Sequence, residues 1–202
     1  MGATTIGPVL VLYSSRDGSV AELANCMARG VESTGVEAIL RTVPRASTVC
    51  EAVEDEIPNA GPPYVQLDEL TRCSALAFGS PSYFGNMSAS LKLFLESTTS
   101  HWMSGALTGK PASLFTSSGS LHGGQESTLL SMMVPLLHHG MLIVGLPYSE
   151  PELSATTSGG TPYGASHVAG ASGDRPVDET ERKLAMALGR RLAETAKRLD
   201  VG

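Results

Sequence analysis

Apolar residues in this chain follow two alternating patterns, short continuous runs and runs with helical spacing. The first run, residues 9–13 (Val-Leu-Val-Leu-Tyr), predicts a buried strand. From Val20 to Val31 apolar residues recur every three or four positions, which predicts an amphipathic helix that ends before Gly35. A strand that passes directly into a helix is the repeating unit of α/β proteins.

The same two patterns continue to the end of the chain. Further strands are predicted at residues 36–43, 73–79, 111–117 and 141–146, and helices at residues 68–70, 87–98, 125–139 and 178–199. The last helix opens with a capping box, Asp178 to Glu181. Five strands that alternate with helices predict a doubly wound, flavodoxin-like α/β fold. Its parallel sheet has the order 2-1-3-4-5 and helices on both faces.

The length and the hydrophobic fraction predict a single domain over residues 1–202. A chain of 202 residues with 42% hydrophobic residues is long enough for one sizeable core and short for two. Two stretches interrupt the pattern. Residues 45–64 combine prolines with acidic residues, which predicts a surface insertion. Residues 147–176 are rich in Gly, Ser, Thr and Pro, which predicts a long loop near an active site or an interface.

Charge and motif content exclude several classes of function. A net charge of -6 disfavours nucleic acid and anionic membranes as partners, because both attract clustered Lys and Arg. No membrane-spanning run and no signal peptide is visible, so a cytoplasmic location is expected. The three cysteines and five histidines show no metal-ligand spacing, so no metal site is expected.

The first predicted strand ends in a turn suited to phosphate. Residues 14–19 read Ser-Ser-Arg-Asp-Gly-Ser, and a helix begins directly after them. A helix start offers unpaired backbone N–H groups and the positive end of the helix dipole, where phosphate binds well. The turn has neither the lysine of a P-loop nor a G-x-G-x-x-G sequence. An ordinary turn whose serines only cap the helix is the alternative interpretation.

Two later strands end in loops of similar chemistry. Residues 80–87 contain a proline, two adjacent aromatics and a glycine, and residues 117–126 contain serines, glycines and a histidine. Ligands of open α/β sheets bind outside the carboxyl ends of the strands, where such loops meet. The pattern therefore predicts a phosphorylated planar cofactor, with one loop on the phosphate and two around a flat ring. The alternative is that Tyr83 and Phe84 only pack over the sheet edge.

Several longer phrases resemble the WrbA family in unbroken order over nearly the whole chain. The most specific are Phe-Gly-Asn-Met-Ser at residues 84–88, His-His-Gly-Met at 138–141 and Gly-Gly-Thr-Pro-Tyr-Gly-Ala at 159–165. Members of that family are flavodoxin-like, FMN-dependent NAD(P)H:quinone oxidoreductases. The resemblance implies FMN as cofactor, NADH or NADPH as co-substrate, a quinone or related planar acceptor, and a homotetramer. No side chain is expected to be catalytic, because the flavin carries the two-electron chemistry.

The resemblance also assigns roles to individual residues. Those around the FMN phosphate would be Ser15, Arg16, Asp17, Gly18, Ser19 and Val20. Those along the flavin ring would be Ser82, Tyr83 and Phe84, with Ser117, Ser118, Gly119, Ser120, Leu121, His122 and Gly123 at the ring edge and ribityl chain. His138 would lie near the ring. Trp102 would form part of the substrate pocket with Asp17 and His138, in the family often across a subunit boundary.

Two departures from the family pattern predict altered substrate use. Asp17 stands where the family usually has an aromatic residue, and a carboxylate there repels the pyrophosphate of a nicotinamide dinucleotide. The loop 118–124 is one residue longer than the pattern, and its Leu121 and His122 are expected to narrow the pocket. A flavodoxin-like electron carrier and an FMN-binding regulatory protein are the alternative functions.

Overall fold

The computed structural model describes residues 6–46 and 58–199. Its strands are β1 (Val9–Tyr13), β2 (Ala38–Thr42), β3 (Ala75–Pro81), β4 (Pro111–Ser118), β5 (Leu142–Ile143) and β6 (Ala165–Val168). Its helices are α1 (Ser19–Glu32), α2 (Leu67–Arg72), α3 (Ala89–Ser97), α4 (Thr99–Met103), α5 (Gln125–His138), α6 (Pro151–Ala155) and α7 (Glu179–Leu199). None of the helices in these two ranges is long and apolar enough to cross a membrane.

The strands form one parallel sheet of order β2-β1-β3-β4-β5, which confirms the predicted order. The predicted count of five strands is wrong, because β6 also pairs with β4. Two short strands divide this edge between them: β5 pairs with Pro111 and Ala112, and β6 pairs with the later residues Phe115 to Ser118.

The stretch 147–176 holds helix α6 and strand β6, where the sequence predicted only a long loop. All four side chains of β6 are buried. Within β6, Ser166 donates a hydrogen bond to Gln125 of α5 at 2.9 Å and accepts one from the Gly160 amide at 2.7 Å. The predicted insertion 45–64 lies partly outside the described residues, since 47–57 are not among them; Tyr64 forms a bridge to Thr42 at the end of β2.

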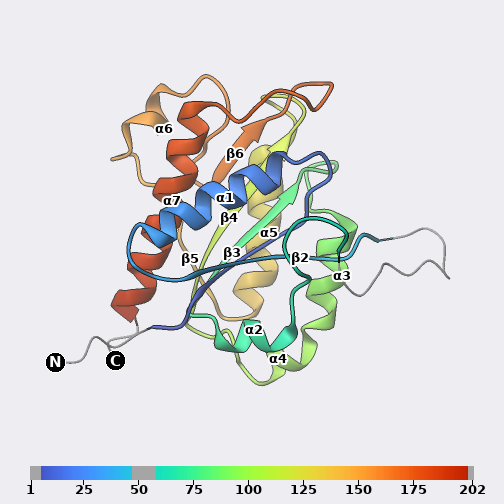
Figure 1. Ribbon diagram of the computed structural model, residues 1–202, viewed down its shortest axis with the longest axis vertical. Coiled ribbons are helices and arrows are strands. Elements are labelled where there is room, and N and C mark those ends of the chain that lie inside the picture. The colour runs from blue at the N-terminus through green and yellow to red at the C-terminus, as the bar shows by residue number, and fades with distance from the viewer. Residues whose placement is uncertain (1–5, 47–57, 200–202) are drawn as a thin grey trace.

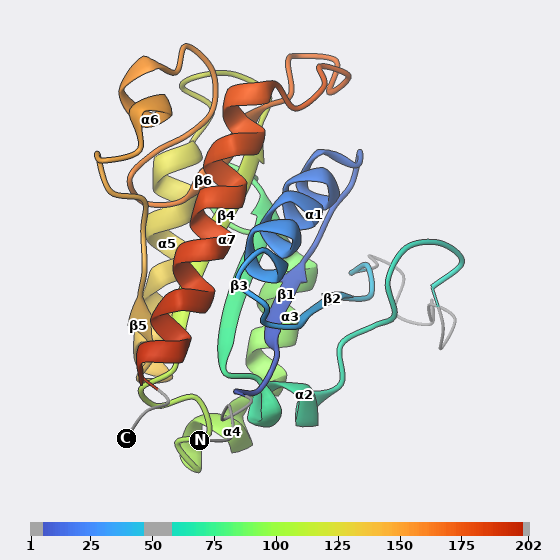
Figure 2. The same ribbon diagram turned by 60° about the vertical axis from the view of Figure 1, so that its left-hand side comes forward.

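Helices cover both faces of the sheet (Figures 1 and 2). Helices α1 and α7 pack side by side on one face, and α3 and α5 lie on the other. Alternate residues of β1 face opposite sides: Val9 and Val11 join the core under α1 and α7, whereas Leu10 and Leu12 join the second core. Strand β1 is therefore buried on both faces, as its continuous apolar run predicts, whereas the edge strands β2 and β5 are only partly buried or exposed.

Glycines allow α1 and α7 to approach backbone to backbone. A Cβ atom built on Gly30 would lie 2.0 Å from the carbonyl oxygen of Met186, and one on Gly189 would lie 2.1 Å from that of Met27. The start of α7 confirms the predicted capping box, because the Glu181 amide donates to the Asp178 side chain and the Asp178 amide donates to the Glu181 carboxylate, each at 2.9 Å. The long helix is therefore fixed at its beginning and along its contact with α1.

Candidate cofactor and substrate site

A cavity of about 390 Å³ opens at the carboxyl ends of β1, β3 and β4, and we call it the strand-end cavity. Four segments line it: Ser15, Arg16, Asp17, Ser19 and Val20 from the β1–α1 turn, Pro81, Ser82 and Tyr83 after β3, Ser117, Ser118 and Gly119 at the end of β4, and residues 169–173 after β6. The structure thus brings together ten of the residues that the sequence predicted for the cofactor. The lining is mainly polar and small, as a site for a phosphorylated ligand requires.

The β1–α1 turn has the features of a phosphate site. Gly18 is the N-cap of α1, with a left-handed φ of 94°, and no side chain caps the first turn. The amide groups there are therefore left for another acceptor. The Ser15 hydroxyl is buried and has no hydrogen-bond partner in the described structure. An unpaired buried hydroxyl beside a helix N-terminus fits a phosphate, which would accept hydrogen bonds from both.

The loop after β3 forms a tight turn beside the cavity. The backbones of Tyr83 and Asn86 exchange hydrogen bonds of 2.8 and 3.0 Å, and Phe84 and Gly85 between them both have positive φ, 52° and 76°. Such a conformation costs a non-glycine residue about 1–2 kcal/mol. Tyr83 lines the cavity, whereas Phe84 is fully exposed and lies outside it.

Hydrogen bonds join the β3 loop to the β4 loop. The Ser82 hydroxyl donates to the Gly123 carbonyl at 3.1 Å and accepts from the Thr128 hydroxyl at 2.8 Å. Gly124, the N-cap of α5, has a left-handed φ of 88°, and a Cβ on it would lie 2.9 Å from the Gly85 Cα. The two loops expected around a flat ring are therefore held together as one unit.

The far part of the β4 loop is not in the cavity. Ser120, Leu121, His122 and Gly123 line neither this cavity nor the larger one described below. The Ser120 carbonyl accepts from the Gly123 amide at 3.0 Å and from the Ser118 hydroxyl at 2.7 Å, which closes these residues into a turn. Leu121 and His122 are exposed and line neither cavity, so the narrowing of the pocket expected from these two side chains stays a prediction.

Residues 169–173, which form one wall of the strand-end cavity, belong to the stretch predicted as a long loop near an active site or an interface, but none of them was named as a site residue. The Ala169 amide donates to the Ser118 carbonyl at 2.8 Å, which places this segment next to β4. It also reaches the β1–α1 turn, because a Cβ on Gly173 would lie 3.7 Å from a carboxylate oxygen of Asp17. The available signal was a run of small residues, Ala-Gly-Ala-Ser-Gly, directly after a strand. That strand, β6, was itself not recognised.

A buried pair lies behind this wall. Both His167 on β6 and Glu181 on α7 are fully buried, and the His167 Nδ1 lies 2.8 Å from the Glu181 Oε2. The other ring nitrogen lies 3.0 Å from the Arg175 carbonyl oxygen. Burial raises the pKa of Glu181, but hydrogen bonds from His167 and from the amides of Asp178 and Gly159 outweigh burial and lower that pKa to about 2. The carboxylate therefore stays ionised and ties the end of β6 to the start of α7.

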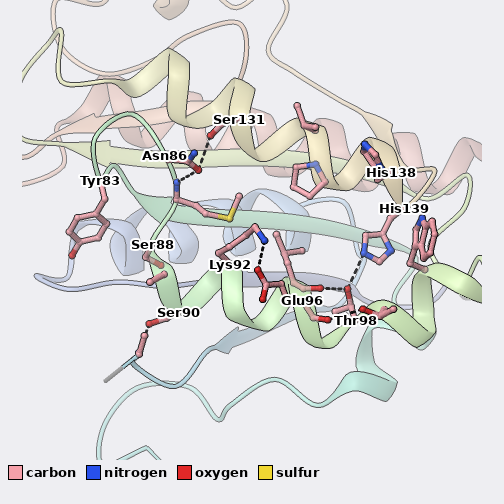
Figure 3. A pocket seen from close by; sticks show the side chains of 18 residues that line it. Tyr83, Asn86, Ser88, Ser90, Lys92, Glu96, Thr98, Ser131, His138 and His139 are labelled. Carbon is pink, nitrogen blue, oxygen red and sulfur yellow. Dashed lines mark hydrogen bonds and ion pairs between the residues drawn. The ribbon is translucent and has the colours of Figure 1, made fainter. Parts of the chain in front are cut away.

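A larger cavity of about 960 Å³ lies between α3, α4 and α5 (Figure 3), and we call it the interhelical cavity. Trp102 and His138 line it, whereas neither lines the strand-end cavity. Tyr83 is the one described residue that lines both. Within a single chain, the predicted substrate residues Trp102 and His138 thus lie in a different cavity from the phosphate turn.

His139 links the helices at one end of the interhelical cavity. Its Nε2 lies 3.0 Å from the Thr98 hydroxyl, which itself donates to the Leu95 carbonyl at 2.7 Å (Figure 3). The hydroxyl must therefore accept a hydrogen bond from the Nε2–H group of His139. Burial, together with the nearby His101 and His138, lowers the pKa of His139 below its usual value of 6.5. A neutral His139 thus serves as a packed link from the end of α5 to the α3–α4 corner.

The fold and the strand-end cavity define a flavodoxin-like flavoprotein. The sequence profile of the family of NADPH-dependent FMN reductases matches residues 8–150, and the chain belongs to this family. It is 44% identical over 199 residues to an NAD(P)H dehydrogenase (quinone) of Syntrophobacter fumaroxidans and 43% identical over 201 residues to one of Geobacter sulfurreducens. Each match covers 95% of this chain and 98% of the relative. These matches confirm the resemblance drawn from the sequence motifs.

Solved structures show the same fold at low sequence identity. A flavodoxin, WrbA-like protein from Agrobacterium tumefaciens superposes with a TM-score of 0.65 at 22% identity, covering 95% of this chain and 98% of that one. Oxidised flavodoxin 2 from Bacillus cereus gives a TM-score of 0.61 at 13% identity, covering 93% of this chain and 99% of that one. These likenesses confirm the flavodoxin-like fold.

Proposed function

We propose that this protein is an FMN-dependent NAD(P)H:quinone oxidoreductase whose strand-end cavity holds the FMN. The observation that carries the proposal is the phosphate turn, in which the buried Ser15 hydroxyl and the uncapped start of α1 converge without a partner of their own. Curated relatives that match nearly the whole chain carry the name NAD(P)H dehydrogenase (quinone), and the family is that of FMN reductases. The bound flavin supplies the redox chemistry, accepting a hydride and passing on two electrons.

The residues around the cavity bind and orient the cofactor in this proposal. Ser15, Ser19 and the first amides of α1 hold the phosphate, and Arg16 adds positive charge. Tyr83 with Ser82 on one side and Ser117 to Gly119 on the other hold the ring and the ribityl chain. Residues 169–173 form a further wall that excludes water from the phosphate end. The assignment of Ser120 to Gly123 to the cofactor finds no support in the geometry, because these residues lie outside the cavity.

We infer that Trp102 and His138 act on the substrate side through assembly of a homotetramer. Large apolar side chains stay exposed on α4, α5 and β5: Trp102, Met103, Leu130, Val134, Leu137 and Leu142. An apolar face of this kind on one chain favours contact with another copy. Trp102 of one subunit would then complete the substrate pocket over the flavin of a neighbouring subunit. Within one chain Trp102 lines a different cavity from the one proposed for the flavin.

Residues 1–202 are also proposed to form a single domain. Both core clusters share the strands of one sheet, and α7, near the end of the chain, packs on α1, near its beginning. The packing of the described residues therefore supports a single domain without an internal boundary.

The visible spectrum and rapid kinetics of the purified holoprotein test this function. Protein purified without added cofactor should be yellow, NADH or NADPH should bleach the flavin under anaerobic conditions, and benzoquinone should restore the colour rapidly. A stable one-electron state in a redox titration without quinone turnover would identify an electron carrier instead. Colourless protein that takes up no FMN would identify a regulatory protein that only retains the fold.

A further inference from the structure

A third cavity, of about 270 Å³, lies between the strand-end cavity and the interhelical cavity, and we call it the arginine cavity. It is lined by Ser14, Ser15, Arg16, Arg45, Ala46, Pro81, Tyr83, Ser88 and Ser90. It shares Ser15, Arg16, Pro81 and Tyr83 with the strand-end cavity, and Ala46, Tyr83, Ser88 and Ser90 with the interhelical cavity. Figure 3 shows Tyr83, Ser88 and Ser90 together at one end of the interhelical cavity, away from His138 and His139.

The lining of the arginine cavity has the chemistry of an anion site. Two guanidinium groups and four serine hydroxyls line it, and no carboxylate is found among its described lining residues. Guanidinium groups bind phosphate through paired N–H donors, and hydroxyls add further donors. The carboxylate of Asp17 lines the strand-end cavity instead, and its contact with Arg16, at 3.8 Å between exposed groups, is weak.

The backbone that carries Arg45 is fixed to the body of the protein. The Ala46 amide donates to the Ser90 hydroxyl at 2.7 Å, which joins the segment after β2 to the first turn of α3. Ser88 caps α3 by accepting from the Leu91 amide, and its own amide donates to the buried Ser80 hydroxyl of β3 at 2.8 Å. Arg45 and the serines thus face one cavity from elements that are held in place before any ligand binds.

We propose that the arginine cavity binds a phosphate group of the nicotinamide dinucleotide donor, with Arg45 as a specificity-determining residue. The proposal rests on the proposed function, since the donor must bring its nicotinamide to the flavin beside Tyr83. Its phosphates then lie outside the strand-end cavity, and the adjoining cavity with cationic side chains receives one of them. The chain carries a net charge of -6, so a local pair of arginines is needed to attract a polyanionic donor.

Substitution of Arg45 in the holoprotein tests the proposal. Flavin reduction is followed by anaerobic stopped flow with NADPH, with NADH and with reduced N-benzylnicotinamide, which carries no phosphate. Arg45→Ala should raise the half-saturating concentration of a phosphate-bearing donor about tenfold, the effect of one charge-assisted hydrogen bond. The limiting rate and the reaction with the phosphate-free donor should not change. The matched control is Arg190→Ala, which removes an exposed arginine of α7 and should alter none of these values.

Comparison of the donors shows which phosphate of the dinucleotide binds in the arginine cavity and which results would contradict the proposal. A loss confined to NADPH assigns the cavity to the 2′-phosphate, and an equal loss with NADH and NADPH assigns it to the pyrophosphate. Unchanged half-saturation with both donors overturns the proposal, and so does release of FMN by Arg45→Ala, which would assign the cavity to the cofactor's own phosphate. Failure of the unsubstituted protein to be reduced even by the phosphate-free donor would count against the proposed function instead.

Discussion

At the scale of residues, two buried polar groups, the Ser15 hydroxyl and the Glu181 carboxylate, differ in whether the protein pairs them. The Ser15 hydroxyl has no partner within the described chain although it is buried, and such a group costs about 1–3 kcal/mol unless a ligand pairs with it. Glu181 is the opposite case, because its carboxylate accepts from His167 and from the amides of Gly159, Val168 and Asp178. The unpaired Ser15 hydroxyl therefore indicates a ligand, whereas the fully paired Glu181 carboxylate has a structural role.

Glu181 should make the free energy of unfolding depend on pH in the acid range. Its pKa is lowered from 4.5 to about 2 in the folded protein, so it contributes stability above pH 4.5 that is lost as the pH falls toward 2. Glu181→Gln places an amide donor among groups that all donate, and should lower the free energy of unfolding by about 3 kcal/mol near neutral pH. Urea unfolding at several pH values measures this.

The same substitution should also weaken FMN retention, since Glu181 and His167 hold the strand that leads into the 169–173 wall. The matched control is Glu179→Gln in the same turn of α7, where the side chain is not buried. A Glu181→Gln variant with an unchanged acid unfolding profile would show that the carboxylate is not held as the structure describes.

Asp17 should oppose the approach of the polyanionic dinucleotide through its charge at the cavity rim. Its side chain is mostly exposed and lies at the rim of the strand-end cavity near Gly173, where it repels an approaching polyanion. Asp17→Asn keeps the shape and removes the charge, and should lower the half-saturating NADH concentration about twofold to threefold at low salt. Stopped-flow reduction at two salt concentrations checks this. The gain should disappear at high salt, and a gain that persists there would have to come from something other than charge.

At the scale of elements, the junction of the β3 and β4 loops sets the shape of the proposed flavin site. Gly124→Ala would place a methyl group 2.9 Å from the Gly85 Cα and force a left-handed conformation on alanine. The two loops should move apart, and FMN affinity should fall about tenfold or more, as measured by fluorescence titration of the apoprotein. Gly35→Ala is a suitable control, because Gly35 also has a positive φ but nothing lies within 4 Å of its added methyl group. Equal FMN affinity in the two variants would show that the contact between the β3 and β4 loops does not determine FMN binding.

The elements that the sequence predicted well are those with long, regular patterns. Strands β1, β3 and β4 have five to eight residues, all but one of them buried, and α1 and α7 have a long helical stripe. Each of these elements was predicted within a few residues of its observed bounds. Strand β5 lies within the strand predicted at residues 141–146 but has only two residues, and β6, with four residues, was not predicted because so short a strand shows no period. Residues 169–173 were predicted only as part of a long loop near an active site or an interface, because the loop after β6 cannot be located before β6 itself is recognised.

The candidate site was predictable only as far as its loops follow recognised strands. The ten predicted cavity residues follow β1 or β3 or lie at the end of β4, whereas Trp102 and His138 are placed by the packing of α4 and α5, which no local pattern reveals. Arg45 carries no motif at all. Its role depends on the meeting of the segment after β2 with α3, a contact between residues 44 positions apart.

At the scale of the whole molecule, the exposed apolar side chains of α4, α5 and β5 have no packing partner within the described part of the chain. Val134 and Leu137 on α5 are each more than half exposed, as is Trp102 on α4. The described core is otherwise closed on both sides of the sheet, so this face does not reflect a poorly packed domain. Assembly would bury it and would bring a second Trp102 toward each flavin.

The double substitution Val134→Asp and Leu137→Asp should therefore separate assembly from cofactor binding. Charges on this face cannot be buried without a partner, so the subunits should dissociate, as sedimentation velocity would show. FMN should stay bound with an unchanged spectrum, because neither residue lines the strand-end cavity. Quinone turnover should fall about tenfold or more, because the dissociated chain would lose the Trp102 that, in the proposed tetramer, a neighbour supplies to the substrate pocket. Leu67→Asp, at an exposed leucine of α2, controls for the added charge. If the dissociated protein turned over quinone at the full rate, the pocket would be complete within one chain, and Trp102 would act only as a contact between subunits.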